Sequence, residues 1–148
     1  MVELLATMVI IGILVGTITS RTLGGFGFDS VKTANGVLSL SRGTQLKALG
    51  LESVGLRIEP SGSNVVFSAV ISGAVSTTRS FSTNEVAITA GTVGSGTSCS
   101  SISSTITLNF DSAGEIETVD DDGFPICLDG ESSLCISPAG FAHEGACL

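Results

Sequence analysis

The segment VELLATMVIIGILVG, residues 2–16, decides the architecture that we expect for this chain. Apart from Glu3, no side chain carries a charge until Arg21, so residues 4–20 form a continuous run of apolar or small residues. An α-helix rises 1.5 Å per residue, and about 20 such residues cross a hydrocarbon layer of about 30 Å. The sequence therefore predicts a membrane-spanning helix over residues 1–23, with a carboxylate near its start.

Glu3 is the residue that a plain membrane anchor leaves unexplained. A charged side chain at the centre of a bilayer costs about 2.5–3.5 kcal/mol on insertion scales. A cleaved signal peptide would place positive charge before the apolar run and a small-residue cleavage site after it. Here the leading charge is negative. An anchor therefore accounts for the hydrophobicity but not for the carboxylate.

The run that includes Glu3 resembles the amino terminus of type IV pilins and of the pseudopilins of type II secretion systems. In that family a prepilin peptidase removes a leader, and the mature chain begins with a methylated Phe and an apolar helix with Glu at its fifth position. Glu3 matches this Glu but is third here, and the Phe-Thr pair and the leader are missing. We expect that Met1 occupies the third mature position; a variant terminus is the alternative.

The resemblance implies a structural function rather than catalysis. The apolar helix would hold the subunit in the bacterial inner membrane, beside an assembly platform, and would later form the core of a filament with copies of itself and related pilins. Glu3 would neutralise the amino terminus of an adjacent subunit, because a buried charge pair is tolerated where a lone charge is not. The residues expected to direct assembly are Glu3, Leu4, Leu5, Val9, Ile10, Ile13 and Leu14.

Residues 24–50 are predicted to form a glycine hinge and the second half of the helix. Gly24, Gly25 and Gly27 each disfavour helix by about 1 kcal/mol relative to Ala, so a hinge is expected, with a simple linker as the alternative. Asp29 or Ser30 can cap a helix that runs to Leu49, before a stop at Gly50. Its apolar residues are Val31, Ala34, Val37, Leu38, Leu40, Leu46 and Leu49, and its cations Lys32, Arg42 and Lys47 are expected to face solvent.

Residues 51–148 change to short apolar or alternating runs between turn residues, a pattern typical of antiparallel strands. We expect an antiparallel β-sheet domain on which the helix packs, which is an α+β fold. Turns are predicted at PSGSN, residues 60–64, and at DSAG, residues 111–114. The predicted strands are residues 54–58, 65–71, 85–89, 104–110 and 114–119, with a surface loop over residues 90–101.

The segment STITLNFDSAGEI, residues 104–116, resembles the strand-turn-strand of minor pilins such as the GspH, FimT and MshC-like proteins. In those proteins a strand ends in Phe-Asp, turns through a Gly and continues the carboxy-terminal sheet. The chain is therefore expected in an extracellular pilus (fimbrium) or a periplasmic pseudopilus, either as the repeated subunit or as a minor pilin. A minor pilin would act as a tip initiator, an adhesin or a secretion component. A membrane-tethered binding domain that never polymerises is the alternative from another class.

The four cysteines all lie in the last third of the chain. On an exported domain an even number implies disulfide bonds. Sequence alone does not choose among the three pairings that four cysteines allow; our prediction is Cys99 with Cys127 and Cys135 with Cys147. A zinc site is the rival interpretation, but the cysteine spacings are wide and His143 is the single His.

Charge is distributed unevenly along the chain, whose net charge is −8. All six Lys and Arg residues lie at or before Arg79, and nothing basic follows them. No direct DNA binding is expected unless the cations gather in one patch, since an acidic face repels phosphates. Asp120, Asp121 and Asp122 offer oxygen ligands that suit Ca²⁺, with a solvated acidic turn as the alternative. Without a GxSxG or HExxH motif, no catalytic residue is expected.

Overall fold

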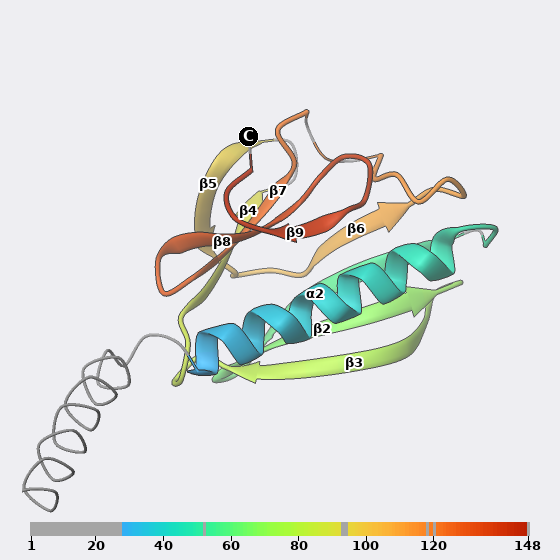
Figure 1. Cartoon of the computed structure of the whole chain (residues 1–148). Helices are drawn as coiled ribbons and strands as arrows, with labels where there is room; N and C mark the ends of the chain where they lie inside the picture. The colour runs from blue at the N-terminus through green and yellow to red at the C-terminus, as the bar shows by residue number, and fades with distance from the viewer. Residues whose placement is uncertain (1–27, 52, 93–94, 118, 120, 148) are drawn as a thin grey trace, which may run out of the picture.

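The computed structural model describes residues 28–51, 53–92, 95–117, 119 and 121–147, which form one helix and two antiparallel sheets (Figure 1). The fold is α+β, as the sequence predicts, but the strands make two sheets rather than one. The elements in chain order are α2 (Phe28–Ala48), β1 (Val54–Ser61), β2 (Asn64–Ile71), β3 (Ala74–Ser82), β4 (Ile88–Thr92), β5 (Ser95–Ser101), β6 (Ile106–Phe110), β7 (Phe124–Leu128), β8 (Glu131–Ile136) and β9 (Ala142–Glu144).

Helix α2 matches the predicted second helical half to within one residue at each end. Its acidic Asp29 lies in the first turn and its basic Lys47 in the last, which complements the helix dipole. Gly50 follows with a φ of 84°, the left-handed conformation that commonly ends a helix. The buried apolar side chains of the helix are Ala34, Val37, Leu38, Leu40 and Ala48.

The expected apolar face of α2 is wrong at three positions. Val31, Leu46 and Leu49 are 56%, 69% and 52% exposed. At 100° per residue Val31 falls beside the buried Leu38, at the border of the buried face, whereas Leu46 falls on the opposite side. Leu49 follows the last residue of the helix, Ala48. The exposed leucines do not contribute to the core of this domain.

The four-stranded sheet has the order β3-β2-β1-β6. Side chains alternate along its strands, so Leu56 on β1 pairs with Ala69 on β2 and with Leu108 on β6, and all three are buried. Helix α2 lies across this buried face (Figure 1). The opposite face carries Arg57 and Glu59, whose side chains lie 3.3 Å apart and remain partly exposed.

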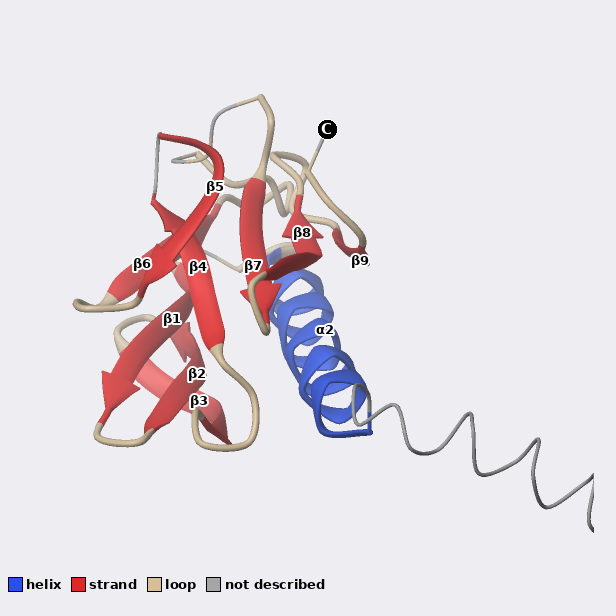
Figure 2. Cartoon of the chain, turned by 90° about the vertical axis from the view of Figure 1, so that its left-hand side faces the viewer, coloured by secondary structure: helices blue, strands red, loops and turns tan. Residues whose placement is uncertain are grey.

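The five-stranded sheet has the order β5-β4-β7-β8-β9, and every residue of β7 is buried. Strands β8 and β9 contact α2, so strands of both sheets flank the helix (Figure 2). One continuous hydrophobic cluster is shared by α2 and the two sheets. The helix and the strands are therefore held together by a common core.

The surface loop predicted over residues 90–101 is wrong, because this segment supplies strand β5 and the end of β4. Gly91 permits the packing: a Cβ there would lie 2.7 Å from Cδ of Pro125 on β7. Small residues thus mark a close approach of strands here rather than a loop. The strand predicted over residues 85–89 begins later, at Ile88, since the amide of Val86 donates to the carbonyl of Ser82 in a turn.

The strand predicted over residues 114–119 is also wrong. Of the residues that the structure describes in this segment, Ile116 alone bridges to Phe110 of β6, and its amide donates to the carbonyl of Pro138 instead of extending the sheet. The side chain of Asp111 holds the preceding turn by accepting the amides of Ala113 and Glu115 at 2.9 and 2.8 Å. Residues 111–117 are therefore a tight loop at the end of β6, and this loop shapes the site described next.

Candidate functional site

The residues expected to direct assembly lie outside the described residues. They are Glu3, Leu4, Leu5, Val9, Ile10, Ile13 and Leu14, together with the hinge residues Gly24, Gly25 and Gly27. In the part of the chain that the structure describes, no helix is both long enough and apolar enough to cross a membrane.

The acidic turn before β7 is described only in part. Asp120 lies outside the described residues, whereas Asp121 and Asp122 are exposed in a turn. No group of three acidic, His or Cys side chains that could hold a metal ion occurs among the described residues. Calcium binding at this turn stays a prediction. Calorimetry with millimolar Ca²⁺ should give binding heat that Asp122→Asn removes, and a titration without heat would exclude the site.

The two disulfide bonds have the pairing predicted from the sequence. Cys99 of β5 is bonded to Cys127 of β7, although β4 lies between these strands in the sheet order. Cys135 of β8 is bonded to Cys147, which ties down the end of the chain after β9. The first bond fastens an edge strand, and the second fastens the carboxy-terminal segment.

Loss of each disulfide should destabilise the domain by a different amount. The bonds close loops with sequence separations of 28 and 12 residues. The chain-entropy relation gives about 3.6 kcal/mol for the longer loop and about 2.8 kcal/mol for the shorter one. Denaturant unfolding of Cys99→Ala/Cys127→Ala should therefore show the larger loss of stability. A larger loss for Cys135→Ala/Cys147→Ala would show that native-state packing outweighs loop entropy.

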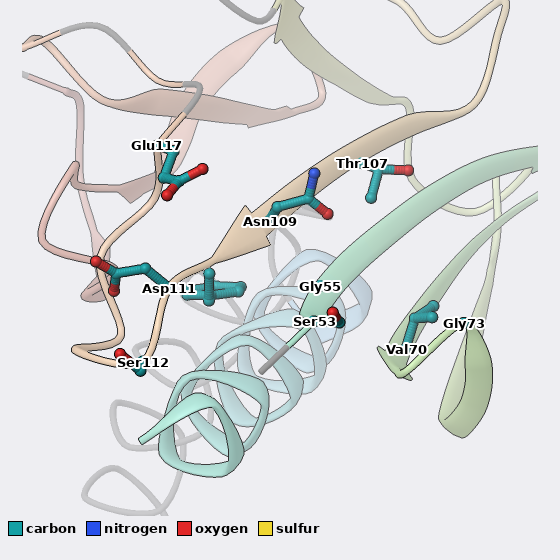
Figure 3. A pocket seen from close by; sticks show the side chains of 10 residues that line it. Ser53, Gly55, Val70, Gly73, Thr107, Asn109, Asp111, Ser112 and Glu117 are labelled. Atoms are coloured by element: carbon teal, nitrogen blue, oxygen red, sulfur yellow. The ribbon is translucent and has the colours of Figure 1, made fainter. Parts of the chain in front are cut away.

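A hollow of about 500 Å³ opens on the outer face of the four-stranded sheet, where β1 begins and β6 ends (Figure 3). Figure 3 shows Thr107 and Asn109 along β6, and Asp111, Ser112 and Glu117 on the loop that follows it. The polar side chains that line the hollow are Ser53, Thr107, Asn109, Asp111, Ser112 and Glu117. None of its lining residues is basic, so the hollow is acidic and offers mainly hydrogen-bond acceptors.

Gly55 lies on the floor of this hollow and keeps it open. A Cβ at this position would lie 3.1 Å from Oδ1 of Asn109 and 3.2 Å from the carbonyl oxygen of Leu108. The Asn109 amide therefore rests against the glycine backbone. Glycine inside a strand commonly marks such a close approach. Both Gly55 and Asn109 lie on strands that the sequence predicts, but the sequence does not indicate that these two residues are neighbours on the outer face of the sheet.

A junction between α2 and two turns fixes the position of the 111–117 loop. Nε2 of Gln45 donates to the carbonyl of Ala139 at 2.9 Å and lies 3.4 Å from that of Gly114. Gly140 is buried against Gly114 with a φ of 78°. The carboxylates beside the hollow are thus positioned by the helix on the other side of the sheet.

A second groove runs between α2 and the edge strand β3, and it is basic. It is lined by Lys47 and Arg79 with no carboxylate among its lining residues. Nζ of Lys47 donates to Oγ of Ser76 at 2.9 Å and to Oγ1 of Thr77 at 3.4 Å. The pairing of β2 with β3 shifts between Ala69 and Val70, which marks a β-bulge. The bulge accounts for the contact of two successive β3 hydroxyl groups, those of Ser76 and Thr77, with one ammonium group.

The cations of α2 were expected to face solvent, and this prediction is partly wrong. Lys32 and Arg42 are exposed, but Lys47 is half-buried in the groove beside β3. Nε of Arg42 donates to the backbone carbonyl of Ala142 at 3.1 Å. Sequence reasoning missed the approach of Lys47 to Arg79, because β3 carries no apolar alternation and was not predicted as a strand.

His143 lies at the exposed edge strand β9. Its Nδ1 is 3.0 Å from the backbone carbonyl oxygen of the adjacent Glu144. This local contact fixes the ring near its own backbone, and the described residues contain no free cysteine. Absence of catalysis stays a prediction.

Comparison of the chain with known protein families, with curated proteins and with solved structures finds no match.

Proposed function

We propose that this chain is a structural subunit of a type IV pilus or a related pilus-like filament. The observation that carries the proposal is the apolar run over residues 4–20 with Glu3 at its head. A lone carboxylate in such a run is costly in a bilayer, and a partner charge in a bundle of helices offsets that cost. Assembly with other chains would supply the partner charge that Glu3 needs.

The described domain supports the proposal through its architecture. Helix α2, which follows the apolar run in the sequence, is 21 residues long and packs on an antiparallel sheet that shares its core. Two disulfide bonds suit a domain exposed to an oxidising compartment. Such a domain would form the outer surface of a filament while the apolar helix forms its centre.

Assembly would transfer the apolar helix from lipid to a bundle of equivalent helices. In lipid the helix is already solvated by apolar tails, so van der Waals packing and charge pairing supply the driving force. Contacts that repeat head to tail without closing produce a filament rather than a ring. The inner-membrane platform and the prepilin peptidase are the partners that this route requires, with a bacterial inner-membrane location before assembly.

A minor subunit or a membrane-tethered binding domain is the second candidate. The observation that favours it is the acidic hollow of about 500 Å³, since concave sites of this size hold ligands in many proteins. A minor subunit would be present at a few copies per filament. An adhesive or secretory task belongs to this candidate as well.

Composition of purified filaments tests the proposal. Filaments sheared from cells that produce this chain would be imaged by electron microscopy, and their proteins counted by mass spectrometry. We expect this chain as the dominant component if it is the repeated subunit, and at a few per cent if it is a minor one. Its absence from filaments that form normally would reject a filament function and leave the membrane-tethered domain.

A further inference from the structure

The net charge of −8 poses a problem for any filament built from this chain. Like-charged subunits repel one another when they are packed closely, and charge-complementary contacts offset that repulsion. Such contacts need cations that are not already paired within the subunit. The described residues contain five cationic side chains in all, which are Lys32, Arg42, Lys47, Arg57 and Arg79.

The partners of these cations separate them into groups. Arg57 lies beside Glu59 on the same strand, and Arg42 donates to the carbonyl of Ala142. Lys47 contacts only hydroxyl groups in the described part of the chain, and Arg79 is exposed with no ion pair there. Lys32 is exposed too, but it lies near the start of α2, whereas Lys47 and Arg79 line one groove. Lys47 and Arg79 therefore leave a pair of positive charges on the flank formed by α2 and β3.

The acidic hollow offers the complementary surface. Oδ1 of Asp111 is held by the amides of Ala113 and Glu115, so its carboxylate is fixed in place before any partner arrives. Glu117 is exposed on the same loop, and Asn109 adds an amide oxygen. A guanidinium group presents five donors in a planar fork that suits carboxylate and amide acceptors.

We propose that Arg79 of one subunit binds the acidic hollow of the next subunit, between Asp111 and Glu117, with Lys47 beside it. The inference rests on the filament function proposed above and names the contact between the outer domains. The basic flank lies at the α2 and β3 side of the domain, whereas the hollow lies on the outer sheet face at the end of β6. Because the two surfaces differ, their contact is heterologous, the type of contact that builds an open helical filament when its rotation does not close a ring.

Charge reversal tests the contact in whole filaments. Arg79→Glu and Glu117→Arg should each lower the amount of the chain in sheared filaments by at least about tenfold, and the double variant should restore most of it. Lys32→Glu is the matched control, because it reverses a positive charge as Arg79→Glu does. Lys32 lies on α2 about 22 Å along the helix axis from Lys47, away from the proposed contact. It should incorporate as the wild type does.

A cross-linking measurement makes the test independent of variants that fold poorly. A carbodiimide joins an amine to a carboxylate in contact, so Lys47 should be linked to Asp111 or Glu117 in wild-type filaments but not in detergent-solubilised monomers. Lack of this link in filaments that contain the chain would overturn the inference.

The outcomes separate this inference from the proposed function. If the wild-type chain is absent from filaments, the filament function fails and the inference fails with it. If the wild type is present and Arg79→Glu incorporates equally well, the inference alone is overturned. In that second case, weaker retention of Arg79→Glu filaments on double-stranded DNA would assign the basic groove to an external polyanion.

Discussion

Replacing Glu3 by Ala is expected to remove the chain from sheared filaments while leaving its amount in the membrane unchanged. In the proposed filament the Glu3 carboxylate pairs with the amino terminus of an adjacent subunit in a medium of low dielectric constant. Removing one partner of a buried pair typically costs about 3–5 kcal/mol, because the other charge stays buried without compensation. This corresponds to at least about a 100-fold loss of incorporation. Mass spectrometry of the sheared fraction measures it directly.

Two further variants define what the Glu3 result means. Glu3→Gln keeps the size and polarity but removes the charge, so it should incorporate nearly as poorly as Glu3→Ala. Met8→Leu changes the same apolar run by a volume-conserving substitution and should incorporate normally. Normal incorporation of Glu3→Ala would contradict the charge-pairing role and favour a membrane-tethered domain that never polymerises.

The helix and the first hairpin could be predicted because local signals agree with the tertiary structure. Asp29 lies in the first turn of the helix and Gly50 follows its end. The PSGSN turn joins β1 to β2, where Gly62 has a φ of 61°. In β1 the apolar Val54, Leu56 and Ile58 alternate with other residues, so a single buried face is evident from the sequence. β2 is recognisable as a short, mostly apolar run between turn residues. The disulfide pairing was predicted correctly, but the sequence alone offered no reason to prefer it.

Besides β5 and the short β9, sequence reasoning missed β3, β7 and β8, for two different reasons. Strand β3 is exposed over most of its length, so it has no apolar pattern to detect. The β7–β8 hairpin has a usable signal, since Asp129 and Gly130 form its turn with φ values of 54° and 86°. An Asp-Gly pair between apolar runs is a strong hairpin signal, and it was overlooked.

The surface features could not be predicted because they depend on which strands become neighbours. The hollow brings together Gly55 and Asn109, and the basic groove brings together Lys47 and Arg79. Each pair is separated by more than 30 residues in the sequence. Charge segregation along the chain indicated an acidic second half but predicted no basic patch, and only the sheet order β3-β2-β1-β6 fixes where the charges lie.

Replacing Gly140 by Ala should lower the free energy of unfolding by about 2–5 kcal/mol. Its φ of 78° is a left-handed conformation that costs an L-residue about 1–2 kcal/mol. A Cβ there would also overlap the carbonyl oxygen of Gly114 and lie 2.9 Å from Nε2 of Gln45. Overpacking of this kind typically costs about 1–3 kcal/mol, and a backbone carbonyl cannot rotate away as a side chain can. Denaturant unfolding of the purified protein measures the loss.

Gly130→Ala separates the two contributions to the Gly140 effect. Its φ of 86° imposes similar backbone strain, but no atom lies within 4 Å of the Cβ that Ala would add. Gly130→Ala should therefore lose only about 1–2 kcal/mol. The difference between the two variants measures the overlap at the Gln45 junction. Equal losses would show that Gly114 yields instead, and the loop that carries Asp111 and Glu117 would then move with it and weaken the proposed contact with Arg79.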